Sequence, residues 1–358
     1  MKMSIQTNHY LKLIILFIIV NLMTGCSTLS YYSQSIQGQL EVIEKSESIS
    51  TLLSEDKITP EEREKLNIVL ALREFSIKEL GLPNNKSYSA YADLGRDYVI
   101  WNIFANPEFS LEPVNWCYFI VGCLSYRGYF SKQDAKQHED ELKQQGFDTY
   151  LGGVSAYSTL GWFNDPVLNS MLRWNESYLA SVMFHELAHQ QLYIKDDTEL
   201  NESYADAVAY IGVTKWLVHK QDETQMLEYK RAQDREKQFV NLINKYKPML
   251  IDLYESEIDD ESKRVKKLLL LKQLQNDYSV MSKNWNKNPY KKWISTDLNN
   301  AKLASIITYR KYVPDFIKIY EKLNRDLPAF YSFAKALSNC NKLNRKKILE
   351  ATEIEFNC

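Results

Sequence analysis

The chain has 358 residues, of which 45% are hydrophobic and 25% charged, so it is long enough for one large globular domain or two small ones. Its formal net charge is only -2, from 44 basic and 46 acidic residues. Such a balance gives no general attraction to nucleic acid or anionic lipid, and we find neither a nucleotide-binding loop nor a Ser-His-Asp hydrolase pattern. We therefore expect no nucleic-acid partner.

Residues 1–25 have the layout of a lipoprotein signal peptide. The apolar run at 13–20 follows two lysines and is too short to span a bilayer core of about 30 Å. Small residues stand directly before Cys26, as in a lipobox, so cleavage would leave Cys26 as the lipid-modified start of a mature chain, 26–358. Ser27 is not the aspartate of inner-membrane retention, which favours the outer membrane. We expect a lipid-anchored, periplasm-facing protein of the cell envelope; an ordinary signal peptide with a chance cysteine is the alternative.

Hydrophobic periodicity and turn signals predict the remaining elements. In chain order they are helices at 32–54 and 60–80, strands within 98–130, a helix at 134–146, a strand and turn at 150–163, and helices at 175–193 and 199–218. Thr59-Pro60-Glu61-Glu62 is a helix start signal. Residues 213–358 contain no glycine, which favours helices joined by short breaks, among them a solvated helix within 220–247 and a helix at 265–274 that buries its leucines.

These elements predict an α+β fold that is predominantly helical. A small twisted sheet would precede the helix at 175–193, and the C-terminal half would be helical. We expect one domain over 26–358, with a first part at 26–218 and a helical part at 219–358.

His185, Glu186 and His189 form an HExxH pattern inside the expected helix at 175–193. Two histidines four residues apart project from the same helix face, about 6 Å apart, so both imidazoles can reach one zinc ion. Glu186 would stand beside the ion, where its carboxylate can accept a proton from water whose pKa the metal lowers to roughly 7. The pattern indicates metal-assisted hydrolysis.

Glu202, in the next expected helix, is placed to be a third ligand. Zinc hydrolases of the His₂Glu type use three protein ligands and keep one position open, and His185, His189 and Glu202 complete that count. Asp206 follows one turn later on the same face and could accept the outer N–H of a ligand histidine. Two alternatives stay open: polar residues on a packed helix without any metal, and a purely structural metal site.

Five cysteines bear on the compartment. If Cys26 carries lipid, four remain, and an even number suits an oxidising environment. Cys117 and Cys123 flank a strand-like stretch and could close a small disulfide loop; Cys340 and Cys358 would then form a second pair. Free buried thiols are the alternative.

The pattern His185-Glu-x-x-His189 followed by Asn201-Glu202-Ser203 resembles the gluzincin metallopeptidases, and more closely a family of bacterial lipoproteins predicted to be aminopeptidases. The resemblance extends over nearly the whole mature chain, to residues 91–94, 99–102, 107–111, 116–130, 152–154 and 156–163. It implies a zincin-like fold, one zinc ion on His185, His189 and Glu202, Glu186 as general base, and a peptide substrate. The spacer from His189 to Glu202 is shorter than in the large gluzincin aminopeptidases, and their amine-binding Gly-x-Met-Glu-Asn box is absent.

Residues 153–157 fall where zincins commonly place the edge strand of the sheet beside the cleft. Tyr157 and this strand could therefore align an extended peptide by main-chain hydrogen bonds, although packing of Tyr157 in the core is an equal alternative. Tyr126 or Arg127 could stabilise the oxyanion of a tetrahedral intermediate.

Two hypotheses follow. The first is a membrane-anchored zinc metallopeptidase, an aminopeptidase by its resemblance, in which one of Glu108, Glu112 or Glu176 holds the substrate's terminal ammonium. The second is a non-catalytic envelope lipoprotein that binds peptides or a protein partner. A complete ligand set and an intact Glu186 favour catalysis. Asn299, Asn300 and Tyr309 also resemble the family. Side-chain amides at a helix start are commonly caps, so the two asparagines are expected to have a structural role before a role in substrate binding.

Overall fold

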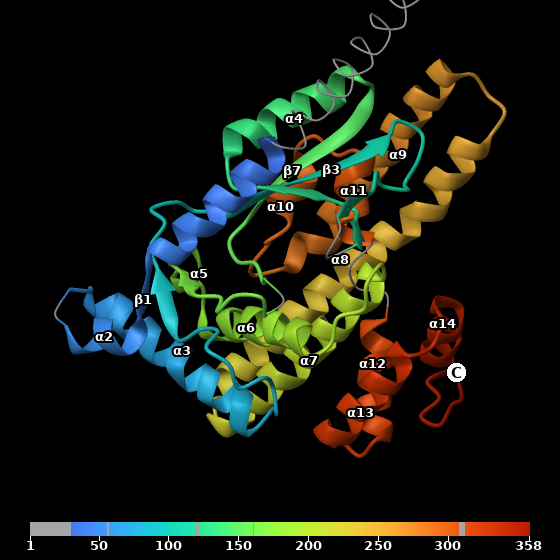
Figure 1. Cartoon of the computed structure of the whole chain (residues 1–358). Coiled ribbons are helices and arrows are strands. Elements are labelled where there is room, and N and C mark those ends of the chain that lie inside the picture. Colours follow the sequence, from blue (N-terminus) through green and yellow to red (C-terminus); the bar gives the residue numbers. More distant parts are fainter. Residues whose placement is uncertain (1–29, 56, 119–121, 160, 308–311) are drawn as a thin grey trace, which may run out of the picture.

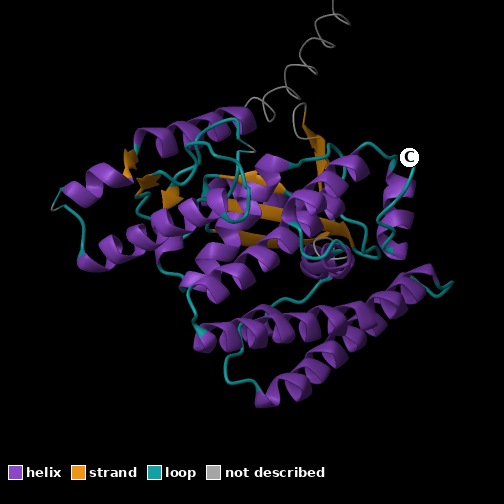
Figure 2. Cartoon of the chain, turned by 90° about the horizontal axis from the view of Figure 1, so that it is seen from below, coloured by secondary structure: helices purple, strands orange, loops and turns teal. Residues whose placement is uncertain are grey.

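The computed structural model describes residues 30–55, 57–118, 122–159, 161–307 and 312–358. The fold is α+β and mostly helical, as predicted, with short strands confined to the first half of the chain (Figures 1 and 2). Cys26 lies outside the described residues. Within the described ranges, none of the helices has both the length and the apolar character that a membrane span requires.

The helix predicted at 32–54 is interrupted in its middle. Residues 30–44 are helical, β1 (Ser46–Ser48) is extended, and α2 (Ile49–Ser54) is a separate short helix. The break occurs because β1 pairs antiparallel with β2 (Ala90–Ala92), a partner more than 40 positions away. Tertiary pairing of this kind overrides local helical periodicity.

Three small sheets replace the single sheet that we predicted. Their strand orders are β1-β2-β8, β6-β3-β7 and β4-β5. The remaining strands are β3 (Ile100–Pro107), β4 (Trp116–Tyr118), β5 (Gly122–Leu124), β6 (Arg127–Tyr129), β7 (Phe147–Val154) and β8 (Val167–Leu168). Among the strands of the described residues, only β3 and β7 reach eight residues, so the other strands form short ladders instead of extending one sheet.

The β3–β7 pair is the scaffold of the site. The two strands run antiparallel in register from Ile100 opposite Val154 to Pro107 opposite Phe147, and β7 is an edge strand. Because side chains alternate along a strand, the two faces of the pair differ. Ile103 packs in an apolar cluster with residues of α4 (Lys132–Gln144), whereas Phe104 faces a cavity on the side of α11 (Asn300–Ile307).

The two central helices, α6 (Glu176–Gln191) and α7 (Thr198–His219), agree with the predicted ranges to within two residues. They pack against each other and against α3 (Pro60–Lys78), which begins at the expected capping box of Thr59 and Glu62. Gly212 of α7 permits the close approach, because a Cβ there would lie 2.6 Å from the ring of Phe184.

The C-terminal half is helical, as the absence of glycine predicted. Its two long helices, α8 (Glu223–Glu255) and α9 (Asp260–Met281), lie side by side along one side of the molecule (Figure 2). The helices not yet introduced are α5 (Asn169–Leu172), α10 (Lys291–Ser295), α12 (Val313–Lys322), α13 (Leu327–Ser338) and α14 (Lys342–Ala351). In α9 the prediction that the leucines are buried is half wrong: Leu271 and Leu274 are buried, but Leu268 and Leu269 are more than 60% exposed.

Candidate metal centre and active site

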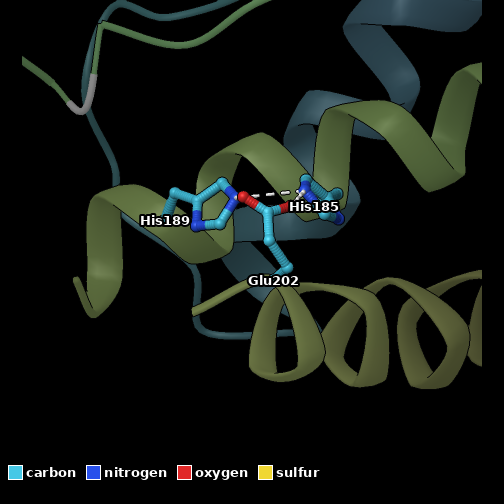
Figure 3. A group of neighbouring side chains, drawn as sticks. All are labelled: His185, His189 and Glu202. Atoms are coloured by element: carbon cyan, nitrogen blue, oxygen red, sulfur yellow. Dashed lines mark hydrogen bonds and ion pairs between the residues drawn. The ribbon is translucent and has the colours of Figure 1, made fainter. Parts of the chain in front are cut away.

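Three predicted ligands meet between α6 and α7. The Nε2 atoms of His185 and His189 are 3.0 Å apart, and the Glu202 carboxylate lies 3.3 Å from the first and 3.7 Å from the second. Figure 3 shows the Glu202 side chain rising from α7 between the two imidazoles of α6. Ligand atoms about 2.1 Å from one tetrahedral zinc ion would be about 3.4 Å apart, so these spacings match a shared ion. The group could hold a metal ion.

Asp206 orients the first histidine. Its carboxylate lies 2.9 Å from Nδ1 of His185, which therefore donates from Nδ1 and leaves Nε2 facing Glu202 and His189. Burial opposes a charge on His185, but hydrogen bonds to Asp206 and Glu202 outweigh it and place the pKa of His185 well above its usual value. Burial likewise favours protonated Glu202, yet the neighbouring His189 and His185 hold the pKa of Glu202 below its usual range.

Glu186 lies at the junction of two cavities, of about 880 and 650 Å³, that both also touch His185. Burial raises the pKa of Glu186, the adjacent histidines lower it, and the carboxylates of Glu202 and Asp165 raise it further. A carboxylate whose pKa is shifted upward is a suitable proton acceptor near neutral pH.

The Asn201-Glu202-Ser203 motif holds the linker between the two helices. The side chain of Asn201 accepts a hydrogen bond from the N–H of Ile194 (2.8 Å) and donates one to its carbonyl oxygen (2.7 Å). Ser203 accepts the N–H of Tyr312 at 3.1 Å, which ties α7 to the start of α12. Sequence reasoning assigned a role to Glu202 alone; the structure shows that its two neighbours fix the position of its helix.

The same linker is braced from two further directions. A buried ion pair joins Asp197 to Arg345 of α14, 2.7 Å apart. The N–H of Cys123 donates to Asp196 at 3.0 Å, so the β4–β5 hairpin also contacts the linker. A disulfide to Cys117 closes this hairpin, as expected from the sequence. The second expected disulfide, Cys340–Cys358, is likewise present and joins the end of α13 to the C-terminus.

The edge of β7 forms the wall shared by both cavities. Gly153, Val154 and Ala156 line each of them, so the predicted position of residues 153–157 beside the cleft agrees with the structure. Tyr157 fits both alternatives predicted from the sequence, a position beside the cleft and packing in the core. It lines the larger cavity, but its hydroxyl donates to Gln39 and its ring packs edge-on against Phe130.

The structure places Tyr126 and Arg127 in different surroundings, because Tyr126 lies in the bend before β6 and Arg127 begins the strand. Tyr126 lines the larger cavity; burial raises the pKa of its hydroxyl, and the carboxylates of Glu202 and Glu186 contribute, so it remains a proton donor. The guanidinium of Arg127 lies 4.1 Å from the centre of the Tyr31 ring, and Arg127 does not line either cavity. Of the two predicted oxyanion residues, the structure brings only Tyr126 to a cavity beside the candidate metal centre.

The three glutamates considered for ammonium binding have other surroundings. Glu108 pairs with Arg264, Glu176 accepts the indole N–H of Trp216, and Glu112 is exposed; none lines either cavity. The amides at the start of α11 serve structure, as the capping alternative indicated: Asn299 caps Lys302 and bonds to β7, and Asn300 is buried against Tyr254. Tyr309 lies outside the described residues.

Two aromatic residues that line the larger cavity were not among those predicted from the sequence. Tyr193 follows the HExxH helix, and Trp293 comes from α10, yet both line the larger cavity. Tyr193 could have been suspected from its position four residues after His189. No local signal marks Trp293, because only the packing of α10 near β7 brings it there.

A family model described as "Putative aminopeptidase" matches residues 30–349. The chain belongs to this family. No curated protein and no solved structure matches it. The match spans every residue of the metal centre and both cavities, and the description of the family supports a peptidase.

Proposed function

We propose that the protein is a zinc-dependent aminopeptidase, held at the outer membrane by lipid on Cys26. The observation that carries the proposal is the convergence of His185, His189 and Glu202 at one point, with Glu186 lining both adjoining cavities. Two imidazoles and one carboxylate are the donor set of catalytic zinc sites, in which the fourth position stays open. Family membership supports peptides as the substrate.

The residues around the site suggest a division of work. Bound zinc would lower the pKa of water and polarise the scissile carbonyl. Glu186 accepts the proton of the attacking water and returns it to the leaving amine. The protonated hydroxyl of Tyr126 donates a hydrogen bond to the carbonyl oxygen as negative charge develops on it. As an edge strand, β7 can align an extended peptide by main-chain hydrogen bonds.

The helix at 30–44 supports a place at the membrane. It carries four exposed apolar side chains at helical spacing, Tyr32, Ile36, Leu40 and Ile43, which therefore share one face. Such a stripe is typical of helices that lie in a membrane interface. It begins only a few residues after Cys26, where lipid would be attached.

The test uses the purified mature protein with zinc content measured by elemental analysis. Short peptides with a free N-terminus should be cleaved after their first residue, and the N-acetylated forms should not. Glu186→Gln should keep its zinc and lose turnover by roughly 10²-fold or more, since it removes the proton acceptor and leaves the ligands. Equal rates on free and acetylated peptides would refute the aminopeptidase assignment, and unchanged turnover in Glu186→Gln would refute the role of the base.

A further inference from the structure

Aromatic side chains are frequent in the lining of the larger cavity. Six of them come from five separate parts of the chain: Phe104, Tyr126, Tyr150, Trp162, Phe163 and Trp293. Among its described lining residues there is no lysine or arginine, and the only carboxylates are Glu186 and Glu202, which belong to the metal centre. Beyond the reacting groups, the cavity therefore offers apolar surface and π faces.

The aromatic floor is fixed by its own packing. The rings of Phe104 and Tyr150, which are paired across β3 and β7, stack with centroids 6.0 Å apart. The Trp293 ring meets Tyr150 edge-on at 6.4 Å, and the Phe239 ring meets Trp293 at 5.4 Å from the other direction. A floor held in this way needs no rearrangement before it contacts a ligand, which reduces the entropic cost of binding.

The rim is also aromatic, and it is exposed. Trp162 and Phe163 are 68% and 49% exposed, so the apolar surface continues out of the cavity to solvent. Their turn is tied down by Asp165, which accepts hydrogen bonds from Thr159 at 2.7 Å and from Gln190 of α6 at 3.2 Å. Exposed apolar groups on an anchored turn beside a cavity are characteristic of ligand-binding surfaces.

The two cavities differ in what they offer a side chain. Both adjoin His185 and Glu186, but the smaller cavity also contains Asp206 and Arg173, which pairs with Asp97 at 2.6 Å. When a peptide is cleaved after its first residue, the side chain of that residue lies next to the reacting groups, and a large apolar side chain is favoured in the more apolar, larger cavity.

We propose that the larger cavity selects peptides whose N-terminal residue has a large apolar or aromatic side chain. This inference rests on the proposed function and specifies its substrate class. A volume of about 880 Å³ falls within the range of about 300–1,000 Å³ typical of ligand pockets, which leaves room for such a side chain above the Phe104 and Tyr150 rings.

Peptides that differ only in their first residue provide the test. We expect kcat/KM for Phe, Trp or Leu at that position to exceed the value for Ala or Asp by about tenfold or more, the usual discrimination of an apolar pocket. A flat profile, or a preference for a charged first residue, would overturn the proposal.

A substitution that fills the cavity makes the test specific. Gly152 lies on the cavity face of β7, and a Cβ there would approach the Tyr150 ring at 3.3 Å. Gly152→Val should lower the Phe-to-Ala ratio of kcat/KM by about tenfold with zinc content unchanged. Thr149→Val is the matched control, because Thr149 faces Glu139 of α4 on the opposite side of the strand; it should leave the ratio unchanged. An equal loss for all peptides in Gly152→Val would contradict the proposal.

Binding separates this inference from the proposed function. The zinc-loaded Glu186→Gln protein should bind a Phe-initial peptide about tenfold more tightly than the Ala-initial peptide, as measured by calorimetry. That preference without turnover in the wild-type protein would support the cavity assignment and refute the peptidase. Turnover of free peptides with no preference in rate or binding would support the peptidase and refute the cavity assignment.

Discussion

At the scale of single residues, the two histidines of the candidate metal centre differ in their outer contacts. His185 donates through Nδ1 to Asp206, whereas the buried Nδ1 of His189 has no hydrogen-bond partner within the described part of the protein. Orientation of the site by protein groups therefore depends chiefly on Asp206, which shares α7 with Glu202.

Replacing Asp206 by Asn should weaken metal binding without abolishing it. The amide can still contact His185 but no longer stabilises the required tautomer with a full charge, and losses of about 10- to 100-fold in affinity are usual for such partners. A zinc competition titration measures the change. His185→Ala, which removes a ligand, should lose bound zinc altogether under the same conditions, and an unchanged affinity in Asp206→Asn would exclude an orienting role.

The hydroxyl of Tyr126 should contribute to turnover and not to metal binding. Tyr126→Phe keeps the ring and removes the hydrogen bond to the developing negative charge, so kcat should fall by about 10²- to 10³-fold with zinc content and fold unchanged. Arg127→Lys is a suitable control, because the neighbouring guanidinium lies over Tyr31 and does not line the cavity. A loss in Arg127→Lys equal to that in Tyr126→Phe would point to a structural effect.

At the scale of elements, the distance between α6 and α7 is the critical dimension, since each helix carries part of the metal centre. Gly212 sets this distance ten residues beyond Glu202, where Phe184 and Leu80 leave no room for a side chain. The other end of α7 is fixed by the hydrogen bonds of Asn201 and by the contacts of Asp196 and Asp197 in the linker.

Gly212→Ala should therefore destabilise the fold and disturb the metal centre together. Forcing a methyl group into a packed helix interface costs about 1–3 kcal/mol of unfolding free energy, even though alanine is the better helix former. Chemical denaturation gives the first quantity, and zinc affinity of the folded protein gives the second. Full stability in Gly212→Ala would show that the helices can separate without strain.

Helices α6 and α7, with their three candidate ligands, were predictable because the relevant spacing is local. The i, i+4 pair at His185 and His189 and the capping box at Thr59 are read within one or two turns. Four features depend on partners distant in sequence: the interruption at β1, the division into three sheets, the position of Arg127 over Tyr31 and the contribution of Trp293 to the cavity. Periodicity contains no information about such partners, so these features had to come from the structure.

At the scale of the whole molecule, the chain combines a cleft at the β7 edge with an N-terminal helix whose apolar stripe is exposed. The helical C-terminal half lies against the rest of the molecule through α8, α11 and α12, and the Arg345–Asp197 pair links its last helix to the linker of the metal centre.

Lipid attachment is tested on the intact chain. Cys26→Ser should abolish incorporation of a labelled fatty acid and shift the protein from the membrane to the soluble fraction after a high-salt wash, because one stripe of four side chains binds bilayers only reversibly. Changing Ser27 instead should leave labelling intact. Firm membrane retention of the unlabelled Cys26→Ser protein would indicate another anchor or a tightly bound partner.

The helix at 30–44 also supports Tyr157, one of the residues that line the larger cavity. Gln39 accepts the hydroxyl of Tyr157, and Gly38 lies so close to Phe130 that a Cβ would be 2.0 Å from its ring. With lipid on Cys26, only residues 27–29 would separate the bilayer from this helix, and three residues span at most about 10 Å. The lipid would then hold the proposed catalytic cleft close to the membrane surface. The rate of turnover would therefore depend on the density of peptides at that surface and not on their concentration in bulk solution.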